Sequence, residues 1–402
     1  MNLVIEVKTL LEKLNVAFPA LNDKDADPIA SHYLFRVGSD FLEILGGHSS
    51  SGLCSYQRVS DLPPTNVDED ETVDFTVDGV KGRGFLKSLS GGSIHITYDS
   101  DMSEVVFSPD SLKAEIRMKS LNPQDSYNFE ADFKRALSSE ETGSFEPHAF
   151  AEALGVTLPF IGKNTAQAGH SLLHLETRDG KGCVCAANGR AISILRHSNI
   201  SGAFDIRGEK AGSLNEFLRV STGKITVREG VSNVFLVEEV SGNFFGFRKV
   251  DYRFPDSLWK LDPFAEDLPT IFKIDREALR KAVSRMQWTL DSTQKRLGIE
   301  LVGDEGDMNS SLRLFTRNTK GTTSEDTLED GVQRVKGSDP VTIYVKIDSL
   351  LRALDKMPGD TVSGYIMKSR SFSVIKFMAS EDDDDATVEQ SIILSLMKPP
   401  RS

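Results

Sequence analysis

The stretch VDYRFPDSLWKLDP, residues 250–263, decides how the chain is divided. It places an Arg-Phe-Pro run ahead of a tryptophan and a second proline. A proline disfavours helical backbone in the residue before it and cannot donate a hydrogen bond to a sheet. We therefore expect residues 250–263 to form a rigid, extended connector. It ends one structural unit, begins the next and contributes to the main partner site.

The sequence on both sides of this connector repeats one pattern. A short strand-like run is followed by a polar residue and then by apolar residues three and four apart, which is typical of a strand that leads into a helix. The starts of these runs are separated by 72, 70, 59, 68 and 73 residues, which predicts six copies of one unit. The copies begin at Leu3, Phe75, Phe145, Phe204, Phe272 and Val345.

The segments between the predicted helices read mostly as strands, because their residues alternate or are rich in β-branched and aromatic types. Each unit is therefore a strand, a helix and about three further strands joined by short loops. One such unit cannot bury both its helix and its sheet, so we expect the units to pair. The predicted strands cover residues 32–37, 41–45, 93–98, 104–107, 172–176, 225–228, 234–238 and 312–316.

The sequence thus predicts an α+β fold of three similar domains, each built from two strand-helix-strands units. We place the domains at residues 1–131, 132–263 and 264–402. The polar stretch 122–144 is the first boundary and the proline-rich connector is the second. An α+β protein with two larger domains is the alternative that this pattern leaves open.

The composition is that of an ordinary soluble globular protein, with 402 residues, 39% hydrophobic and 27% charged. No apolar run is long enough to span a membrane, and the acidic residues Glu6 and Glu12 do not fit a signal peptide. We expect a cytoplasmic protein. Cys183 and Cys185 form one C-x-C with no second pair for zinc, so they and Cys54 are expected to be buried thiols.

Positive charge is concentrated in the predicted helices. They hold 17 Lys and Arg against 12 Asp and Glu, a net +5, whereas the whole chain carries −13 and the remainder therefore −18. In the fifth helix Lys281 and Arg285 lie opposite an apolar face, with Arg276 and Arg280 beside them. A single charged helix face is commonly only solvated, but several gathered together would suit contact with DNA phosphates. The apolar face comprises Leu279, Ala282, Val283, Met286 and Leu290.

No motif for catalysis or for a cofactor is found. The pair Gly223-Lys224 follows a predicted helix instead of opening one, and the histidines show no H-E-x-x-H spacing. The acidic tract 381–385 is expected to be a solvated hairpin loop. We therefore predict that the protein is not an enzyme and needs no cofactor or metal.

Several segments resemble the bacterial-type β sliding clamp, the processivity factor of replicative DNA polymerases. The connector resembles the family's G-R-F-P-D-Y segment, and the similarity extends over essentially the full chain. The other matching segments are residues 77–121, 172–193, 272–287 and 386–402.

This resemblance implies that two copies join head to tail into a closed ring around duplex DNA, with helices lining the hole and sheets outside. The ring would slide along DNA and tether the polymerase. A sequence-independent DNA-binding protein that does not encircle its substrate, or a structural assembly protein, is the alternative. The residues expected to face DNA are Lys8, Lys13, Lys81, Arg83, Lys87, Lys210, Arg219, Arg280, Lys281, Arg285, Arg352 and Lys356.

The resemblance also implies an apolar cleft that accepts a short linear motif of the polymerase and of the clamp loader. The chain departs from the family's T-D-G-H-R-L segment, since it reads A-N-G-R-A-I and places Arg190 at the family's histidine, unless a gap aligns it with the arginine. The same residues could instead form only a contact between domains. The expected cleft residues are Ala187, Gly189, Arg190, Ile192, Pro255, Leu261, Leu396, Met397 and Pro399.

Dimer contacts in this family come from an edge strand of the first domain and a helix end of the last. By position, Ile116 and Met118 of one protomer are expected to face Trp288 and Leu290 of the other. An exposed edge with alternating apolar residues would invite aggregation in a monomer, and pairing with a partner edge removes that hazard.

Overall fold

A computed structural model describes residues 1–110, 112–126, 128–162, 168–256, 270–288, 296–303, 310–317, 323–336, 341–368, 373–379 and 387–397. The chain divides into two compact units. Unit 1 consists of Met1–Ala151, Gly202–Ile206 and Lys210–Asp251. Unit 2 consists of Glu152–Ser201, Arg207–Glu209 and Tyr252–Ser402.

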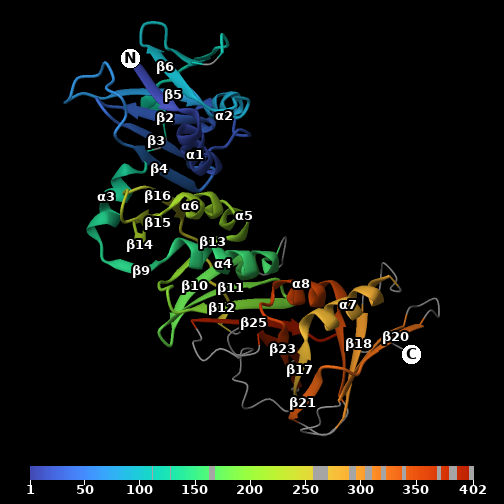
Figure 1. Cartoon of the computed structure of the whole chain (residues 1–402). Helices are drawn as coiled ribbons and strands as arrows, with labels where there is room; N and C mark the ends of the chain where they lie inside the picture. The colour runs from blue at the N-terminus through green and yellow to red at the C-terminus, as the bar shows by residue number, and fades with distance from the viewer. Residues whose placement is uncertain are drawn as a thin grey trace. The chain divides into compact units, whose positions relative to one another are not determined.

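The six predicted repeats are confirmed, because each begins with a strand that runs into a helix (Figure 1). Three further strands follow in each repeat, and the fifth repeat has one more. The strand-helix pairs are β1 Asn2–Glu6 with α1 Val7–Ala17, β5 Val73–Asp78 with α2 Gly79–Lys87, β9 Glu141–Phe145 with α4 Pro147–Thr157, β13 Phe204–Arg207 with α5 Gly208–Ala211 and α6 Leu214–Val220, β17 Thr270–Asp275 with α7 Arg276–Gln287, and β22 Val341–Lys346 with α8 Ile347–Lys356.

Aspartates at the ends of two strands explain where the following helices begin. The Asp78 carboxylate accepts hydrogen bonds from the backbone N–H groups of Val80 and Lys81. Asp275 accepts one from Ala278 over 2.6 Å. These contacts satisfy N–H groups that have no partner within the first helical turn.

Unit 1 contains two antiparallel sheets, with strand orders β1-β6-β7-β8 and β5-β2-β3-β4-β16-β15-β14-β9. In the second sheet β4 pairs with β16, so residues far apart in the sequence share one ladder, with Tyr56 opposite Phe244. The strands not yet given are β2 His32–Val37, β3 Leu42–His48, β4 Leu53–Val59, β6 Ser93–Asp99, β7 Glu104–Pro109, β8 Ile116–Lys119, β14 Ile225–Glu229, β15 Asn233–Glu238 and β16 Phe244–Arg248.

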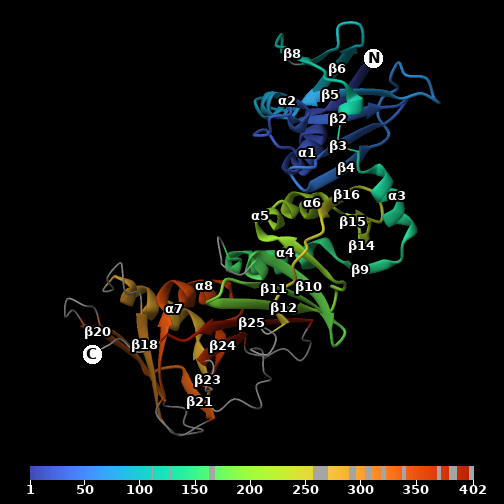
Figure 2. The same cartoon turned by 180° about the vertical axis from the view of Figure 1, so that it is seen from behind.

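The helices α1, α2 and α6 lie side by side in unit 1 (Figures 1 and 2). Leu10, Leu14 and Leu86 of α1 and α2 are fully buried and pack with Phe35 and Phe75 of the sheets. The apolar side of these helices therefore forms the core of unit 1, and their other side is left for charged residues.

The polar stretch 122–144 contains a helix, α3 Glu130–Ser138, that the sequence analysis did not predict. Phe129 and Ala136 are buried against Phe235 and Phe244, and the Phe133 ring centroid lies 3.9 Å from that of Phe244. This boundary is thus an ordered element that packs on the β4–β16 junction. The short 3-10 helices are η1 Phe18–Ala20, η2 Pro28–Ser31, η3 Pro123–Asp125, η4 Leu158–Phe160 and η5 Ala168–Ser171.

Unit 2 contains the strand orders β10-β11-β12-β25-β24-β23-β17-β21 and β20-β19-β18-β22. The pairing of β12 with β25 is its long-range junction, with Ala191 opposite Leu394 and His197 opposite Val388. The remaining strands are β10 Leu172–Arg178, β11 Lys181–Ala187, β12 Ala191–His197, β18 Arg296–Val302, β19 Ser311–Arg317, β20 Thr323–Leu328, β21 Val332–Lys336, β23 Thr361–Lys368, β24 Ser373–Ala379 and β25 Val388–Ser395.

The connector is described as far as Asp256, and it packs on unit 2. The Phe254 ring is buried and stacks on His174, with centroids 4.9 Å apart. A side chain at Gly169 would come within 2.8 Å of the Arg253 carbonyl and of the Pro255 ring, so only glycine fits there. The described part of the connector is therefore packed closely, while residues 257–263, with the second proline, lie outside the described residues.

The described residues also bear on the predictions for the cysteines and for membrane spans. The three cysteines are buried, as predicted. No helix in the described part of the chain is long and apolar enough to cross a membrane. The sequence-based predictions for Leu261, Leu290, Pro399 and the tract 381–385 lie outside the described residues.

Candidate functional site

The predicted DNA-facing residues of unit 1 lie on its helices, but they differ in exposure. Lys8, Lys81, Lys87 and Arg219 are exposed, and Lys210 is half-exposed. Arg83 instead donates a 2.6 Å hydrogen bond to Asn15 and lies over the Phe18 ring at 4.2 Å. We call the exposed side of α1, α2, α5 and α6 the helix face of unit 1. The predicted residues on these helices are Lys8, Lys13, Lys81, Arg83, Lys87, Lys210 and Arg219.

Lys13 is half-buried. Burial lowers the pKa of its ammonium group, while the neighbouring carboxylates of Glu238 and Glu12 act in the opposite direction. Burial disfavours a charged amine because the protein interior solvates it poorly. Lys13 is therefore less suited to contact a phosphate than Lys8 on the same helix.

In unit 2 the predicted DNA-facing residues lie on α7 and α8, which pack against each other. Leu279, Ala282, Val283 and Met286 are buried, so the predicted apolar face of α7 is confirmed. We call the opposite, exposed side of α7 and α8 the helix face of unit 2. Its predicted residues are Arg280, Lys281, Arg285, Arg352 and Lys356.

Much of the positive charge on the helix face of unit 2 is paired within the chain. Arg280 donates to Asp355 over 2.6 Å, and Arg285 donates to Asp326 over 2.6 Å. Lys281 lies 4.0 Å from Glu277 and remains 65% exposed. By contrast, Lys8, Lys87 and Lys210 form no ion pair with another described residue. The net attraction for phosphates is therefore weaker than the sequence count of basic residues indicates.

The predicted cleft is built around the turn between β11 and β12. Gly189 has φ of +77°, a left-handed conformation that glycine adopts readily. The Asn188 side-chain oxygen accepts hydrogen bonds from the N–H groups of Arg190 and Ala191. The turn is thereby fixed, and the Arg190 side chain is exposed beside the end of β25.

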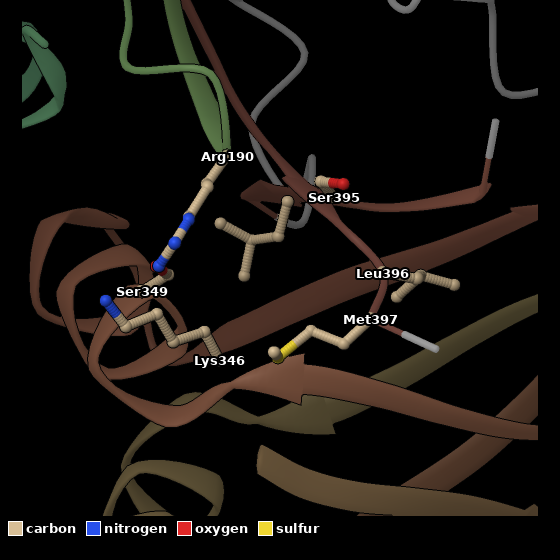
Figure 3. A pocket seen from close by; sticks show the side chains of 7 residues that line it. Arg190, Lys346, Ser349, Ser395, Leu396 and Met397 are labelled. Atoms are coloured by element: carbon tan, nitrogen blue, oxygen red, sulfur yellow. The ribbon is translucent and has the colours of Figure 1, made fainter. Parts of the chain in front are cut away.

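Backbone hydrogen bonds hold the end of β25 against this turn. The Ser395 N–H donates to the Arg190 carbonyl over 2.8 Å, and the Met397 N–H donates to the Tyr344 carbonyl over 2.7 Å. Between these segments is a pocket of about 160 Å³ (Figure 3). Its lining residues are Arg190, Lys346, Ser349, Leu394, Ser395, Leu396 and Met397.

Three of the predicted cleft residues, Arg190, Leu396 and Met397, line this pocket. Ala187 and Ile192 are buried in an apolar cluster with Phe254 and support the turn from beneath. Lys346, Ser349, Leu394 and Ser395 were not predicted for the site. The pairing of β12 with β25 brings Leu394 and Ser395 to Arg190, whereas the contacts of β25 and the following residues with α8 and β22 bring in Lys346 and Ser349.

The comparisons with solved structures find close similarity over nearly the whole chain. The DNA polymerase sliding clamp from Pseudomonas aeruginosa is 18% identical, with 99% of this chain and 100% of that chain covered and a TM-score of 0.79. The DNA polymerase III beta subunit from Thermotoga maritima gives 16% identity, the same coverage and a TM-score of 0.79. The sliding clamp from Caulobacter crescentus gives 15% identity and a TM-score of 0.76 at this coverage.

The chain has the sliding-clamp fold. No protein-family model and no curated protein sequence matches the chain. The likeness is therefore one of three-dimensional structure, across six repeats whose sequences have diverged.

A dimer contact of the predicted kind needs strands at the edges of sheets. Strand β8 is an outer strand of its sheet in unit 1, and β20 is an outer strand in unit 2 (Figure 2). Met118 of β8 is only 3% exposed and packs into the core, so a partner could reach its backbone but hardly its side chain. Ile116 is half-buried, and Trp288 is 91% exposed. Of the three predicted contact residues that the structure describes, Trp288 offers the largest accessible apolar surface.

Proposed function

We propose that the protein is a DNA sliding clamp, which encircles duplex DNA and tethers the replicative polymerase so that synthesis is processive. The observation that carries this proposal is the structural likeness to DNA polymerase sliding clamps over 99% of the chain. In this proposal the protein performs no catalysis. It acts by topology and by offering binding surfaces, and we expect it in the cytoplasm.

The proposed ring is a head-to-tail homodimer of three-domain protomers, with domains at residues 1–131, 132–263 and 264–402. Within the chain, β4–β16 and β12–β25 each join strands from distant parts of the sequence into one sheet. Pairing of β8 with the partner's β20 would repeat this arrangement and would cover two exposed edges. Because each protomer contributes both edges, two copies can close the ring.

The charges on these two edges are complementary. Strand β8 exposes Arg117 and Lys119, whereas β20 carries Glu325 and Asp326. Arg117 is paired with Glu104 and Glu115 in the monomer, and Glu325 with Arg313. Asp326 is paired with Arg285, so of these four edge residues only Lys119 forms no ion pair with another described residue. The basic β8 edge and the acidic β20 edge would still favour the heterologous pairing over contact of two identical edges, because two like-charged edges repel.

The helix faces of both units are proposed to line the hole. Lysines without an intramolecular partner, such as Lys8 and Lys87, would contact phosphates in any register along the duplex. Arginines paired with carboxylates, such as Arg280, would contribute less. A weakly attractive wall suits sliding, because retention comes from the closed ring and not from affinity.

The pocket at Arg190 is the proposed docking site for a short linear motif of the polymerase and of the loader that opens the ring. An extended segment binds such a site through a few buried anchors. Replacing Met397, which is half-buried in the pocket lining, with Asp should abolish polymerase binding and leave the dimer intact.

The mass in solution tests the ring proposal. The chain has a mass of 44.3 kDa, so a dimer of about twice that mass is expected at micromolar concentration. A monomer at this concentration would contradict ring closure and would favour a DNA-binding protein that does not encircle its substrate. A trimer would require a different ring.

A further inference from the structure

The pocket at the end of β25 is positively charged on one side. Figure 3 shows the side chains of Arg190 and Lys346 reaching the same region, beside Ser349. Neither cation forms an ion pair with another described residue, although the chain as a whole carries a net charge of −13. Asp348, in the same helical turn as Ser349, does not line the pocket. Two unpaired cations at one pocket favour the binding of an anion.

The rest of the pocket is apolar. Leu394 and Met397 line it, and the Met397 side chain extends toward Lys346 (Figure 3). Methionine is polarisable and adapts its shape to a bound apolar group. The volume of about 160 Å³ is close to that of a cavity of about 150 Å³ that holds benzene in another protein. The pocket therefore fits one large apolar side chain next to an anionic group.

We propose that the linear segment bound here carries an aspartate or glutamate that lies between Arg190 and Lys346, next to an apolar anchor on Leu394 and Met397. This inference rests on the proposed partner cleft and specifies the chemistry of the motif. A peptide that carries an acidic side chain beside an apolar one accounts for both the cationic side and the apolar side of the pocket. A phosphate of duplex DNA would account only for the cations, since the bases are stacked inside the duplex and place no apolar group on Leu394 and Met397.

Hydrogen bonds between a carboxylate and cationic donors are stronger than neutral ones. At a partly exposed site we expect neutralising the acid to weaken binding about tenfold, which corresponds to about 1.4 kcal/mol. The same charge interaction should be screened by salt, so the affinity of the acidic peptide should fall between 0.05 and about 0.5 M salt. The affinity of its neutral counterpart should change little.

The test uses a random heptapeptide library displayed on phage and selected on the full-length protein. The best peptide is then synthesised with its acid as Glu and as Gln, and both affinities are measured by fluorescence anisotropy. The variant is Arg190→Ala with Lys346→Ala. The matched control is Lys134→Ala with Arg135→Ala, which removes one lysine and one arginine from exposed positions on α3 without touching the pocket.

We expect selection to enrich one acidic position beside apolar residues, with a tenfold preference for Glu over Gln that is lost in the pocket variant and kept in the control. Peptides that bind without an acid preference, or with a preference that survives the pocket variant, would overturn this inference and leave the cleft intact. If Met397→Asp, at a half-buried position of the pocket lining, weakens the binding of none of the selected peptides, the proposed partner cleft itself is wrong.

Discussion

Glu238 is a buried carboxylate that ties the segment after α6 to β15. Its side chain accepts hydrogen bonds from the backbone N–H groups of Thr222, over 2.6 Å, and Gly223, over 3.1 Å, and from the Ser241 hydroxyl. Burial by itself would raise the pKa of this carboxyl. The hydrogen bonds, together with the nearby Lys13 ammonium, outweigh burial and hold the pKa below its usual value.

Because its folded-state pKa is lowered, Glu238 stabilises the fold at pH values above its usual pKa of 4.5, and this contribution is lost as the pH falls through the folded value. We expect Glu238→Gln to reduce the free energy of unfolding at pH 7 by about 1 kcal/mol, because a charged acceptor is lost. The difference from the parent protein should shrink below pH 4.5. A difference that stays constant with pH in urea titrations would contradict this role.

Lys8, Lys87 and Lys210 allow a test of the helix face, since they have no ion-pair partner among the described residues. Each phosphate contact contributes about 0.9 to the slope of log affinity against log salt. Replacing all three with alanine should lower that slope by up to about 2.7, measured by anisotropy on a short duplex. The Lys134→Ala, Arg135→Ala protein is the control. An unchanged slope in the triple variant would place DNA contact elsewhere.

At the scale of elements, α3 is the clearest departure from what the sequence indicated. Residues 122–144 are rich in polar residues and were assigned to a boundary, yet Phe129 and Phe133 lie on one side of a short helix and pack on β15 and β16. A helix of nine residues has too few turns for a clear apolar period. Its stability comes from tertiary packing, which the local pattern does not contain.

We predict that Phe133→Ala lowers the stability of unit 1 by about 2 kcal/mol, less than for a fully buried phenylalanine. Leu137→Ala on the same helix is the control, since Leu137 is 47% exposed and its loss should cost less than about 0.5 kcal/mol. Thermal unfolding followed by circular dichroism measures both changes. Equal effects of the two substitutions would show that α3 is not anchored by its aromatic face.

The repeat, by contrast, could be predicted, because each copy contains its own local sequence pattern of a strand followed by a helix. Predicted runs such as residues 32–37 and 93–98 correspond to β2 and β6 within one residue. The pocket could be predicted only in part. Arg190 and Met397 came from the resemblance. Lys346 lies on β22, in a different sheet, and it reaches them because the Met397 N–H donates to the Tyr344 carbonyl and α8 packs on β25, which are contacts without a local signal.

Trp288 directly follows the last residue of α7 and is expected to lie in the dimer interface. A tryptophan that is 91% exposed in the monomer is an unusual apolar surface, and tryptophans often dominate interface energies. We predict that Trp288→Ala weakens the dimer at least tenfold in sedimentation experiments. Val240→Ala, at another exposed apolar position, should leave the dimer unchanged. If the two variants dimerise equally well, Trp288 is not part of the interface.

At the scale of the whole molecule, the β4–β16 junction lies within unit 1 and the β12–β25 junction lies within unit 2. The segment 132–263 contributes to both units, since β16 pairs with β4 and β12 pairs with β25. These junctions use the same backbone ladders as the sheets themselves, so the connections are as regular as those inside a domain. Such continuity suits a protein whose proposed task is to stay closed around DNA.

The central claim is that DNA is held by encirclement and not by affinity. The most direct measurement loads the protein with its ATP-driven loader on nicked circular DNA, raises the salt to 1 M and then cuts half of the sample with a restriction enzyme. At this salt the Debye length is about 3 Å, so contacts with phosphates are screened. We predict that the protein stays on intact circles through gel filtration and is lost from the linear DNA. Loss from circles and linear DNA alike at high salt would contradict the claim.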